Sequence, residues 1–197
     1  GESVEQRNNI CLTCHKSGDR LHWPGSAHEA EDLACVSCHS IHKPNDVIER
    51  TSQNEVCYKC HNNVRAQTYQ RSSHAIREAK LVCSDCHNPH GAIGPAGLKQ
   101  YTINDNCYTC HAEKRGPFTW EHAPVPEDCS LCHKPHGSIH PALLRTRPPY
   151  LCQQCHPNAT SDFPDSWVGH FEPTAEEHPL LFGVEWFYRL LIPAVLG

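Results

Sequence analysis

Methionine is absent from this chain of 197 residues, and aromatic residues make up only 8% of it. Without methionine the chain has no thioether side chain to offer to a metal ion. Basic residues are outnumbered as well, because 17 lysines and arginines stand against 22 aspartates and glutamates, which gives a formal net charge of -5. An acidic chain is poorly suited to the phosphate backbone of a nucleic acid, so no nucleic-acid partner is expected.

The chain also has little material for a conventional hydrophobic core. Its 11 glycines and 16 prolines interrupt regular structure at many points, and charged residues make up 20% of it. Turn-rich segments such as residues 88–97 and 145–150 favour loops, so regular secondary structure should be modest. Some other group must therefore occupy much of the interior.

Cysteine and histidine, by contrast, are abundant, with 14 and 17 copies. The cysteines form seven pairs separated by two residues, each pair is followed at once by histidine, and no cysteine is left over. C-x-x-C-H is the attachment sequence of a c-type haem, in which both cysteines bond the porphyrin and the histidine coordinates the iron. Zinc sites and thiol redox pairs do not require that histidine. We therefore expect seven covalently bound haem c groups, at Cys11/Cys14/His15, Cys35/Cys38/His39, Cys57/Cys60/His61, Cys83/Cys86/His87, Cys107/Cys110/His111, Cys129/Cys132/His133 and Cys152/Cys155/His156.

The haem motifs recur in pairs with a period of 45 to 50 residues, measured from Cys11 to Cys57, Cys107 and Cys152. Such a period is typical of an array of similar units, each too small to fold alone. The predicted fold is mostly irregular with short helices: an elongated multihaem array whose haems form much of the core. A haem domain over 1–178 would comprise repeats at about 8–53, 54–103 and 104–148 and a half-repeat at 149–178. The haem-free chain is expected to be largely unfolded.

Ten histidines lie outside the motifs, more than the seven needed to give every iron a second histidine. Three of them follow the motif histidine of the second site in each repeat by three residues, and three others stand between the two sites of a repeat. The half-repeat has one histidine at the equivalent intermediate place. The predicted sixth ligands are His42, His90 and His136, His28, His74 and His122, and His170. The remaining three, His22, His140 and His178, are expected at the surface or beside the ligands, with His140 or His178 as substitutes for His170.

The spacing of His87 and His90 restricts what His90 can bind. Residues three apart on a helical turn point to the same side, whereas two ligands of one iron must approach from opposite faces of the porphyrin. His90 should therefore serve a neighbouring haem. The histidines that stand between the two sites of a repeat, here called the intermediate histidines, could serve either the first or the second haem of their own repeat. The half-repeat favours the first, because His170 would then serve the seventh haem.

The alternating CxxCH and CxxCHxxH motifs over about residues 8–170 resemble those of the doubled-CxxCH multihaem c-type cytochromes. This group includes periplasmic decahaem cytochromes of outer-membrane conduits and pentahaem donors to nitrite reductase. The resemblance implies bis-histidine haems in close succession that pass electrons one at a time, after secretion and haem attachment outside the cytoplasm. A start at Gly1, without methionine or a signal-peptide pattern, fits a mature secreted form.

An electron carrier with redox protein partners is favoured over an enzyme, because every motif keeps its histidine and no iron needs an open position. The absence of methionine ligands predicts low potentials. Two alternatives are a subunit of an extracellular cytochrome filament, which would be a homo-oligomer, and a multihaem reductase with one open haem.

The segment 179–197 differs in composition from the rest, being mostly apolar with only Glu185 and Arg189 charged. It could lie in a membrane interface, begin a membrane span, or pack on haem edges or another subunit. We expect a membrane- or partner-contacting segment. The chain would then be the haem arm of a membrane-associated, quinone-linked complex on the periplasmic or extracellular side of the cytoplasmic membrane, or at the cell surface.

Overall fold

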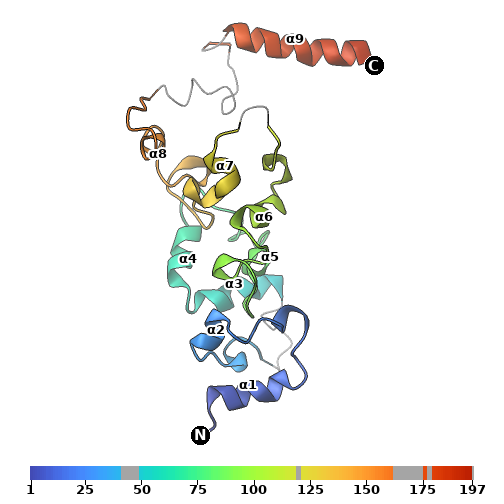
Figure 1. Ribbon diagram of the computed structural model, residues 1–197, viewed down its shortest axis with the longest axis vertical. Coiled ribbons are helices and arrows are strands. Elements are labelled where there is room, and N and C mark those ends of the chain that lie inside the picture. The colour runs from blue at the N-terminus through green and yellow to red at the C-terminus, as the bar shows by residue number, and fades with distance from the viewer. Residues whose placement is uncertain (41–48, 119–120, 162–174, 177–178, 197) are drawn as a thin grey trace. The chain divides into compact units, whose positions relative to one another are not determined.

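The computed structural model describes residues 1–40, 49–118, 121–161, 175–176 and 179–196. Within these ranges the chain consists of short helices joined by turns, apart from one helix of 18 residues near the C-terminus, and its only β pairing is three isolated bridges (Figure 1). The predicted fold class, mostly irregular with short helices, is confirmed. The chain divides into two compact units, Gly1–Thr146 and Arg147–Gly197, which are described separately.

The first unit holds three successive haem-motif repeats on brief helical segments. The label α denotes an α-helix and η a 3-10 helix. The second unit holds the half-repeat and the C-terminal segment. In chain order the elements are α1 (Val4–Leu12), η1 (Gly18–Arg20), α2 (Ala27–Ala30), η2 (Cys35–Ser37), α3 (Arg50–Tyr58), α4 (Asn62–Thr68), α5 (Cys83–Cys86), η3 (Pro95–Gly97), α6 (Ile103–Tyr108), η4 (Ala112–Lys114), α7 (Pro124–Glu127), η5 (Cys129–Leu131), η6 (Pro141–Leu143), α8 (Tyr150–Gln153) and α9 (Pro179–Leu196).

Side-chain caps begin two of the three helices that carry the first site of a repeat, α1 and α6, but not α3. At α1, the Ser3 hydroxyl accepts from the Gln6 N–H at 3.1 Å, and the Gln6 side chain accepts in return from the Ser3 N–H at 2.8 Å. At α6, the Thr102 hydroxyl accepts from the Asp105 N–H at 3.0 Å. These caps satisfy N–H groups that have no partner inside the helix, which stabilises such short segments.

All seven CxxCH motifs form one helical turn, as expected. In each, the N–H of the motif histidine donates to the carbonyl of the first cysteine, at distances between 2.7 and 3.0 Å. The first site of a repeat lies at the end of a longer helix, α1, α3 or α6, whereas the second site lies on a separate turn, η2, α5 or η5, that begins at its first cysteine.

The apolar interior of the described residues is very small. Five apolar side chains are buried, and seven buried polar residues accompany them, including Asn8, Asn54 and Asn104. So small a core cannot offset the conformational entropy of ordering nearly 200 residues. This is consistent with the expectation that bound groups supply much of the interior.

Neighbouring repeats meet through the loop that follows the second site. Ser72 of one repeat and Ser138 of the next exchange backbone hydrogen bonds of 2.9 and 2.8 Å. Gly137 lies so close to the Gln67 carbonyl that a β-carbon would overlap it, and Gly91 lies equally close to the His22 carbonyl. Glycine is needed after the histidine of this loop because another backbone occupies the side-chain position.

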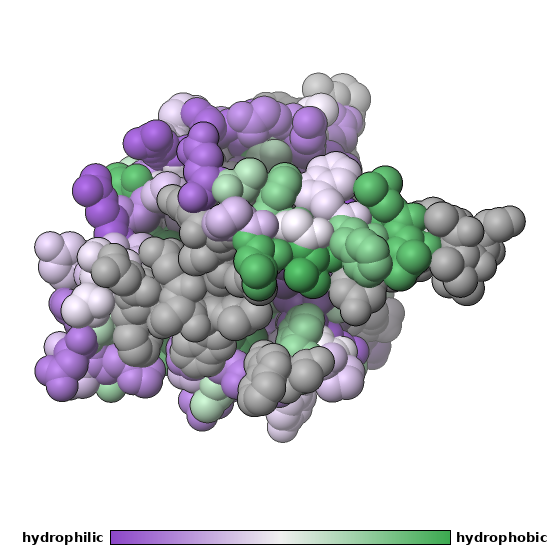
Figure 2. Space-filling view, turned by 90° about the horizontal axis from the view of Figure 1, so that it is seen from above, coloured by the Kyte–Doolittle hydropathy of each residue, from purple (hydrophilic) through white to green (hydrophobic). Residues whose placement is uncertain are grey.

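Helix α9 carries several large exposed apolar side chains, among them Leu180, Phe187 and Leu190 at 78, 59 and 67% exposure. Figure 2 shows hydrophobic residues gathered along this helix. The Arg189 guanidinium lies 5.7 Å from the ring centre of Trp186. Among the residues that the structure describes, no helix combines the length and hydropathy that a membrane crossing requires.

Candidate haem sites

The first cysteines of the two sites in a repeat lie side by side. Cys57 and Cys83 share a hydrogen bond, which raises the pKa of the Cys57 thiol and lowers that of Cys83. Burial, together with the neighbouring Cys129, raises the pKa of Cys107 to about 11. Each complete repeat therefore brings two porphyrin attachment points together, and the third such pair is Cys11 and Cys35.

The second cysteines of the motifs lie closer to the surface than the first. All seven first cysteines are half-buried, whereas six of the second cysteines are exposed and one is half-buried. The exposed ones are Cys14, Cys38, Cys60, Cys86, Cys110 and Cys155, and the half-buried one is Cys132. In six of the seven motifs the second cysteine is therefore more exposed than the first. Porphyrin attachment through Cys14, Cys60, Cys110, Cys132 and Cys155, as through the other motif cysteines, stays a prediction from the sequence.

The second cysteines are positioned by the same helical turn that positions the motif histidines. The N–H of Cys14 donates to the Cys11 carbonyl at 3.2 Å, and that of Cys60 to the Cys57 carbonyl at 3.3 Å. The same bond is present at 3.1 Å for Cys110, 3.2 Å for Cys132 and 3.1 Å for Cys155, each to the first cysteine of its own motif. The turn thus places the two sulfurs of a motif at a recurrent spacing, as a common attached group requires.

Four pairs of histidine rings face each other in the first unit. In each pair, one ring belongs to a CxxCH motif and the other to a histidine outside the motifs. The ring centres are 6.1 Å apart for His28 and His61, 6.2 Å for His74 and His111, 5.8 Å for His39 and His90, and 6.1 Å for His87 and His136.

These separations fit a metal ion held between the two rings. An imidazole nitrogen lies about 2 Å from a bound metal and the ring centre about 1 Å behind it, so two imidazoles on opposite sides of one ion have centres about 6 Å apart. His90 Nδ1 is also buried without a hydrogen-bond partner among the described residues, as expected of a site built around a further group. The residues present therefore fit bis-histidine haem iron.

The pairs join neighbouring repeats rather than the two sites of one repeat. His28 of the first repeat lies against the motif histidine His61 of the second, and His90 of the second lies against His39 of the first. The ring of His90 thus lies beside the motif histidine of a neighbouring site. The helical turn assumed for His87 and His90 is absent, because α5 ends at Cys86 and His87 has extended backbone. Both alternatives for His28 placed it at a haem of its own repeat, and the structure instead brings it to the following repeat.

Backbone carbonyls determine which nitrogen of several rings carries the proton. His28 Nδ1 lies 2.7 Å from the Pro89 carbonyl, and His87 Nδ1 lies 3.1 Å from the Ala96 carbonyl. A carbonyl only accepts, so Nδ1 is protonated and Nε2 keeps the lone pair that a metal needs. The same contacts recur one repeat later, at 2.7 Å for His74 and Pro135 and 2.8 Å for His133 and Ala142.

Two of these carbonyls depend on an uncommon backbone conformation. Ala96 and Ala142 have φ angles of 53° and 51°, in the left-handed region that alanine seldom adopts. The conformation turns the carbonyl toward the motif histidine nine residues earlier. Its recurrence at equivalent positions of two repeats, each time beside a metal-binding candidate, links it to the site.

The electrostatics of the second-site loops favour neutral imidazoles. Burial lowers the pKa of His87, His90 and His136 below the ordinary histidine value. A neutral ring has a lone pair available for iron at neutral pH, whereas a protonated ring has none.

The ring pairs contain eight of the predicted ligands. His42, His170 and His178 lie outside the described residues, and ligation by His15, His122, His133 and His156 stays a prediction from the sequence. His22 is exposed, as expected. His140 donates its backbone N–H to the Ser138 hydroxyl at 3.0 Å.

Three buried asparagines were missed in the sequence: Asn8, Asn54 and Asn104. Each stands three residues before the first cysteine of a repeat, and its side chain binds the first cysteine of the second site through the backbone N–H, at 2.9, 3.0 and 2.7 Å. The signal was available, because asparagine recurs at this offset in every complete repeat.

Comparison with known families agrees with this arrangement. Residues 74–116 and 122–161 match the doubled CXXCH motif model, and residues 1–52 match the NrfB-like c-type cytochromes. The chain therefore belongs to the doubled-CxxCH multihaem c-type cytochromes.

Individual relatives point to the same class. The chain is 54% identical over 155 residues to the multiheme cytochrome MtrA of Shewanella baltica, which is 78% of this chain and 46% of that protein. It is 31% identical over 67 residues to the cytochrome c-type protein NrfB of Escherichia coli, covering 32% of this chain and 35% of the relative. The chain thus spans about half or less of the length of these relatives.

Proposed function

We propose that this chain is a heptahaem electron carrier, in which seven haem c groups with two histidine ligands each pass electrons between redox protein partners. The observation that carries the proposal is the set of four cross-repeat histidine pairs with ring centres 5.8 to 6.2 Å apart. An iron with two imidazole ligands has no open position for a substrate, which favours an electron carrier over an enzyme.

The pairs define a ligand scheme that can be extended along the chain. An intermediate histidine serves the first site of the following repeat, and the histidine of a second-site loop serves the second site of the preceding repeat. The irons of His15, His133 and His156 are not covered by the four pairs, and the sequence offers His42, His122 and His170 for them.

The residues of the chain hold the ligands ready for iron. The carbonyls of Pro89 and Pro135 hold the proton on Nδ1 of His28 and His74, and burial keeps His90 and His136 neutral. When bound, haem c supplies reversible one-electron exchange at its iron, which no side chain in this chain can supply. The loop from His87 to His90 touches three sites, since it contains a motif histidine, a ligand for the preceding repeat and the carbonyl that orients His28.

We further propose a periplasmic location, because its relatives are cytochromes c and covalent haem attachment takes place outside the cytoplasm. Helix α9 would contact a membrane interface or a membrane-bound subunit through its exposed apolar side chains. Membership of a quinone-linked complex at the cytoplasmic membrane belongs to the same proposal. The acidic chain and its haem propionates would suit a partner with a basic docking face.

The ligation proposal is tested on the holoprotein. Pyridine haemochrome absorbance together with intact mass should give seven haems per chain, and low-temperature EPR should show only low-spin ferric iron. Carbon monoxide should not bind to the reduced protein as isolated. A high-spin signal or carbon monoxide binding in the wild-type chain would instead support a reductase with an open haem.

The membrane proposal needs a separate experiment. The full holoprotein and a form lacking residues 179–197 are floated with vesicles of mixed neutral and anionic lipid. Recovery of the full chain with the vesicles, and loss of that recovery on deletion, is the expected result. Equal recovery of both forms would exclude membrane contact through α9.

A further inference from the structure

We propose that Asn8, Asn54 and Asn104 are positioning residues that set the distance and angle between the two haems of each repeat. The inference rests on the proposed function, since it concerns the haems bound by this chain. It adds a side chain that is not an iron ligand, but joins the two attachment turns of one repeat.

Each asparagine satisfies a helix terminus that lacks a partner of its own. Cys35, Cys83 and Cys129 begin the short turns η2, α5 and η5, and the first N–H groups of a helix have no intrahelical acceptor. The side chain of the residue just before a helix normally accepts from the second or third N–H, so the first N–H needs an acceptor from elsewhere. Here it comes from a different helix, 25 to 29 residues earlier in the chain.

The other end of the same side chain is bound as well. Asn8 Nδ2 donates to the Leu33 carbonyl and Asn104 Nδ2 to the Val125 carbonyl, both at 2.9 Å. Asn54 Nδ2 donates to the Ile76 carbonyl at 3.2 Å. The three residues are only 5 to 9% exposed, so both groups of the amide replace hydrogen bonds that water cannot supply.

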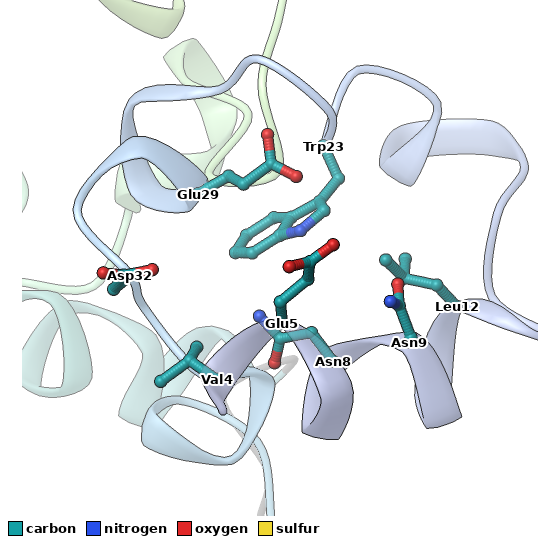
Figure 3. A pocket seen from close by; sticks show the side chains of 8 residues that line it. All are labelled: Val4, Glu5, Asn8, Asn9, Leu12, Trp23, Glu29 and Asp32. Atoms are coloured by element: carbon teal, nitrogen blue, oxygen red, sulfur yellow. The ribbon is translucent and has the colours of Figure 1, made fainter. Parts of the chain in front are cut away.

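In the first repeat, Asn8 lies on α1 next to the buried Trp23 (Figure 3). Both residues line one small hollow with Val4 and Leu12. Asn9, the next residue of the same helix, is exposed. Two asparagines in succession on one helix therefore differ in burial and in bonding, which provides a matched control.

Each of these asparagines connects the two turns to which the porphyrins of one repeat are attached. Asn8, Asn54 and Asn104 each stand three residues before one first cysteine and bind the backbone of the other, and the two cysteine side chains are in contact. In the haem-bound protein both sulfurs carry thioether bonds, so the position of one turn relative to the other determines how the two porphyrins lie.

Asparagine occurs three residues before the first cysteine only in repeats that have a second haem site. The half-repeat has a single CxxCH motif, and the position three residues before Cys152 is Pro149. Proline has no side-chain acceptor or donor, and no second CxxCH motif follows this site in the sequence. A residue needed only to build a CxxCH helix would be expected at all four positions.

The test compares Asn8→Ala with Asn9→Ala in the full holoprotein. Closely spaced haems couple their Soret transitions, and the resulting circular-dichroism couplet depends on their separation and angle. We expect Asn8→Ala to lower the amplitude of the couplet while haem content and the low-spin EPR signal stay at wild-type values. Asn9→Ala should leave all three unchanged. Asn104→Ala, in the third repeat, should repeat the effect.

A conservative variant separates positioning from folding. Asn8→Asp keeps an acceptor for the Cys35 N–H but loses the donor to Leu33, so its couplet should lie between those of wild type and Asn8→Ala. A couplet in Asn8→Ala equal to that of Asn9→Ala would overturn the proposal. So would a loss of haem in both Asn8→Ala and Asn8→Asp, which would assign the residue to haem loading instead. Failure of the proposed function differs from either result, because it would appear as missing haems or high-spin iron in the wild-type protein.

Discussion

Replacing His90 by alanine should open the iron of a different repeat. The His90 and His39 ring centres are 5.8 Å apart and their planes lie within 11° of parallel, so His90 is the proposed sixth ligand of the haem at Cys35 and Cys38. Its removal leaves one iron in seven with five ligands, and five-coordinate ferric haem is high-spin. EPR spin quantitation should therefore assign about one seventh of the iron to a high-spin signal, and the reduced protein should bind one carbon monoxide per chain.

The affected haem can be identified by deleting it. In a chain with Cys35→Ser and Cys38→Ser, the predicted partner haem is absent, and His90→Ala should add no high-spin iron. The control His22→Ala, at an exposed histidine outside the ring pairs, should leave the wild-type chain fully low-spin. High-spin iron that persists in the cysteine-deleted background would show that His90 serves another haem. A fully low-spin His90→Ala protein would refute its role as a ligand.

Three further predictions concern the haems, the acid stability and the unloaded chain. The ring planes are 11° and 28° from parallel in two histidine pairs and 50° and 54° in the other two. EPR should therefore resolve two low-spin classes, a rhombic one from the nearly parallel pairs and a strongly anisotropic one from the tilted pairs. A single class would contradict the pairing. Hydrogen bonds from Arg50 lower the pKa of Asp85, so their contribution to stability is present above the ordinary carboxyl value of 3.8 and is lost as pH falls through the lowered value. Asp85→Asn should thus lower the urea midpoint at pH 7, and only slightly, because Arg50 is half exposed and solvent screens the pair. The difference from wild type should vanish in acid. An equal difference at both pH values would count against the ion pair. Chain produced without haem attachment should lack a cooperative urea transition by far-UV circular dichroism, because only five apolar side chains are buried among the described residues; a sharp, native-like transition would be the opposite result.

Much of the local chemistry could be predicted from the sequence because it depends on short spacings. The CxxCH motif fits within one helical turn, and the N–H of each motif histidine does bond to the first cysteine's carbonyl. The turn-rich composition likewise predicted short helices and loops. The prediction for His90 assumed a helical turn from His87 to His90, and this premise was wrong, because α5 ends at Cys86 and His87 has extended backbone. The ring of His90 nevertheless lies beside His39 of the preceding repeat.

The partner of each additional histidine depends on how repeats meet, which local spacing does not contain. His28 reaches the second repeat because the loop after His87 docks on the first, through Pro89 and through Gly91 against the His22 carbonyl. Every residue has a backbone carbonyl, so the sequence does not show which carbonyl will contact a histidine ring. The recurrence of Asn8, Asn54 and Asn104 three residues before a first cysteine is visible in the sequence. Their role could not be predicted, because it depends on hydrogen bonds to the second site that only the structure shows.

The central claim is that one histidine from each of two neighbouring repeats holds a single iron. Locating the iron atoms by anomalous diffraction in crystals of the holoprotein tests this most directly. Iron should lie between His28 and His61, between His39 and His90, between His74 and His111, and between His87 and His136. Iron bound by His28 and a motif histidine of its own repeat, or by one histidine only at these positions, would contradict it.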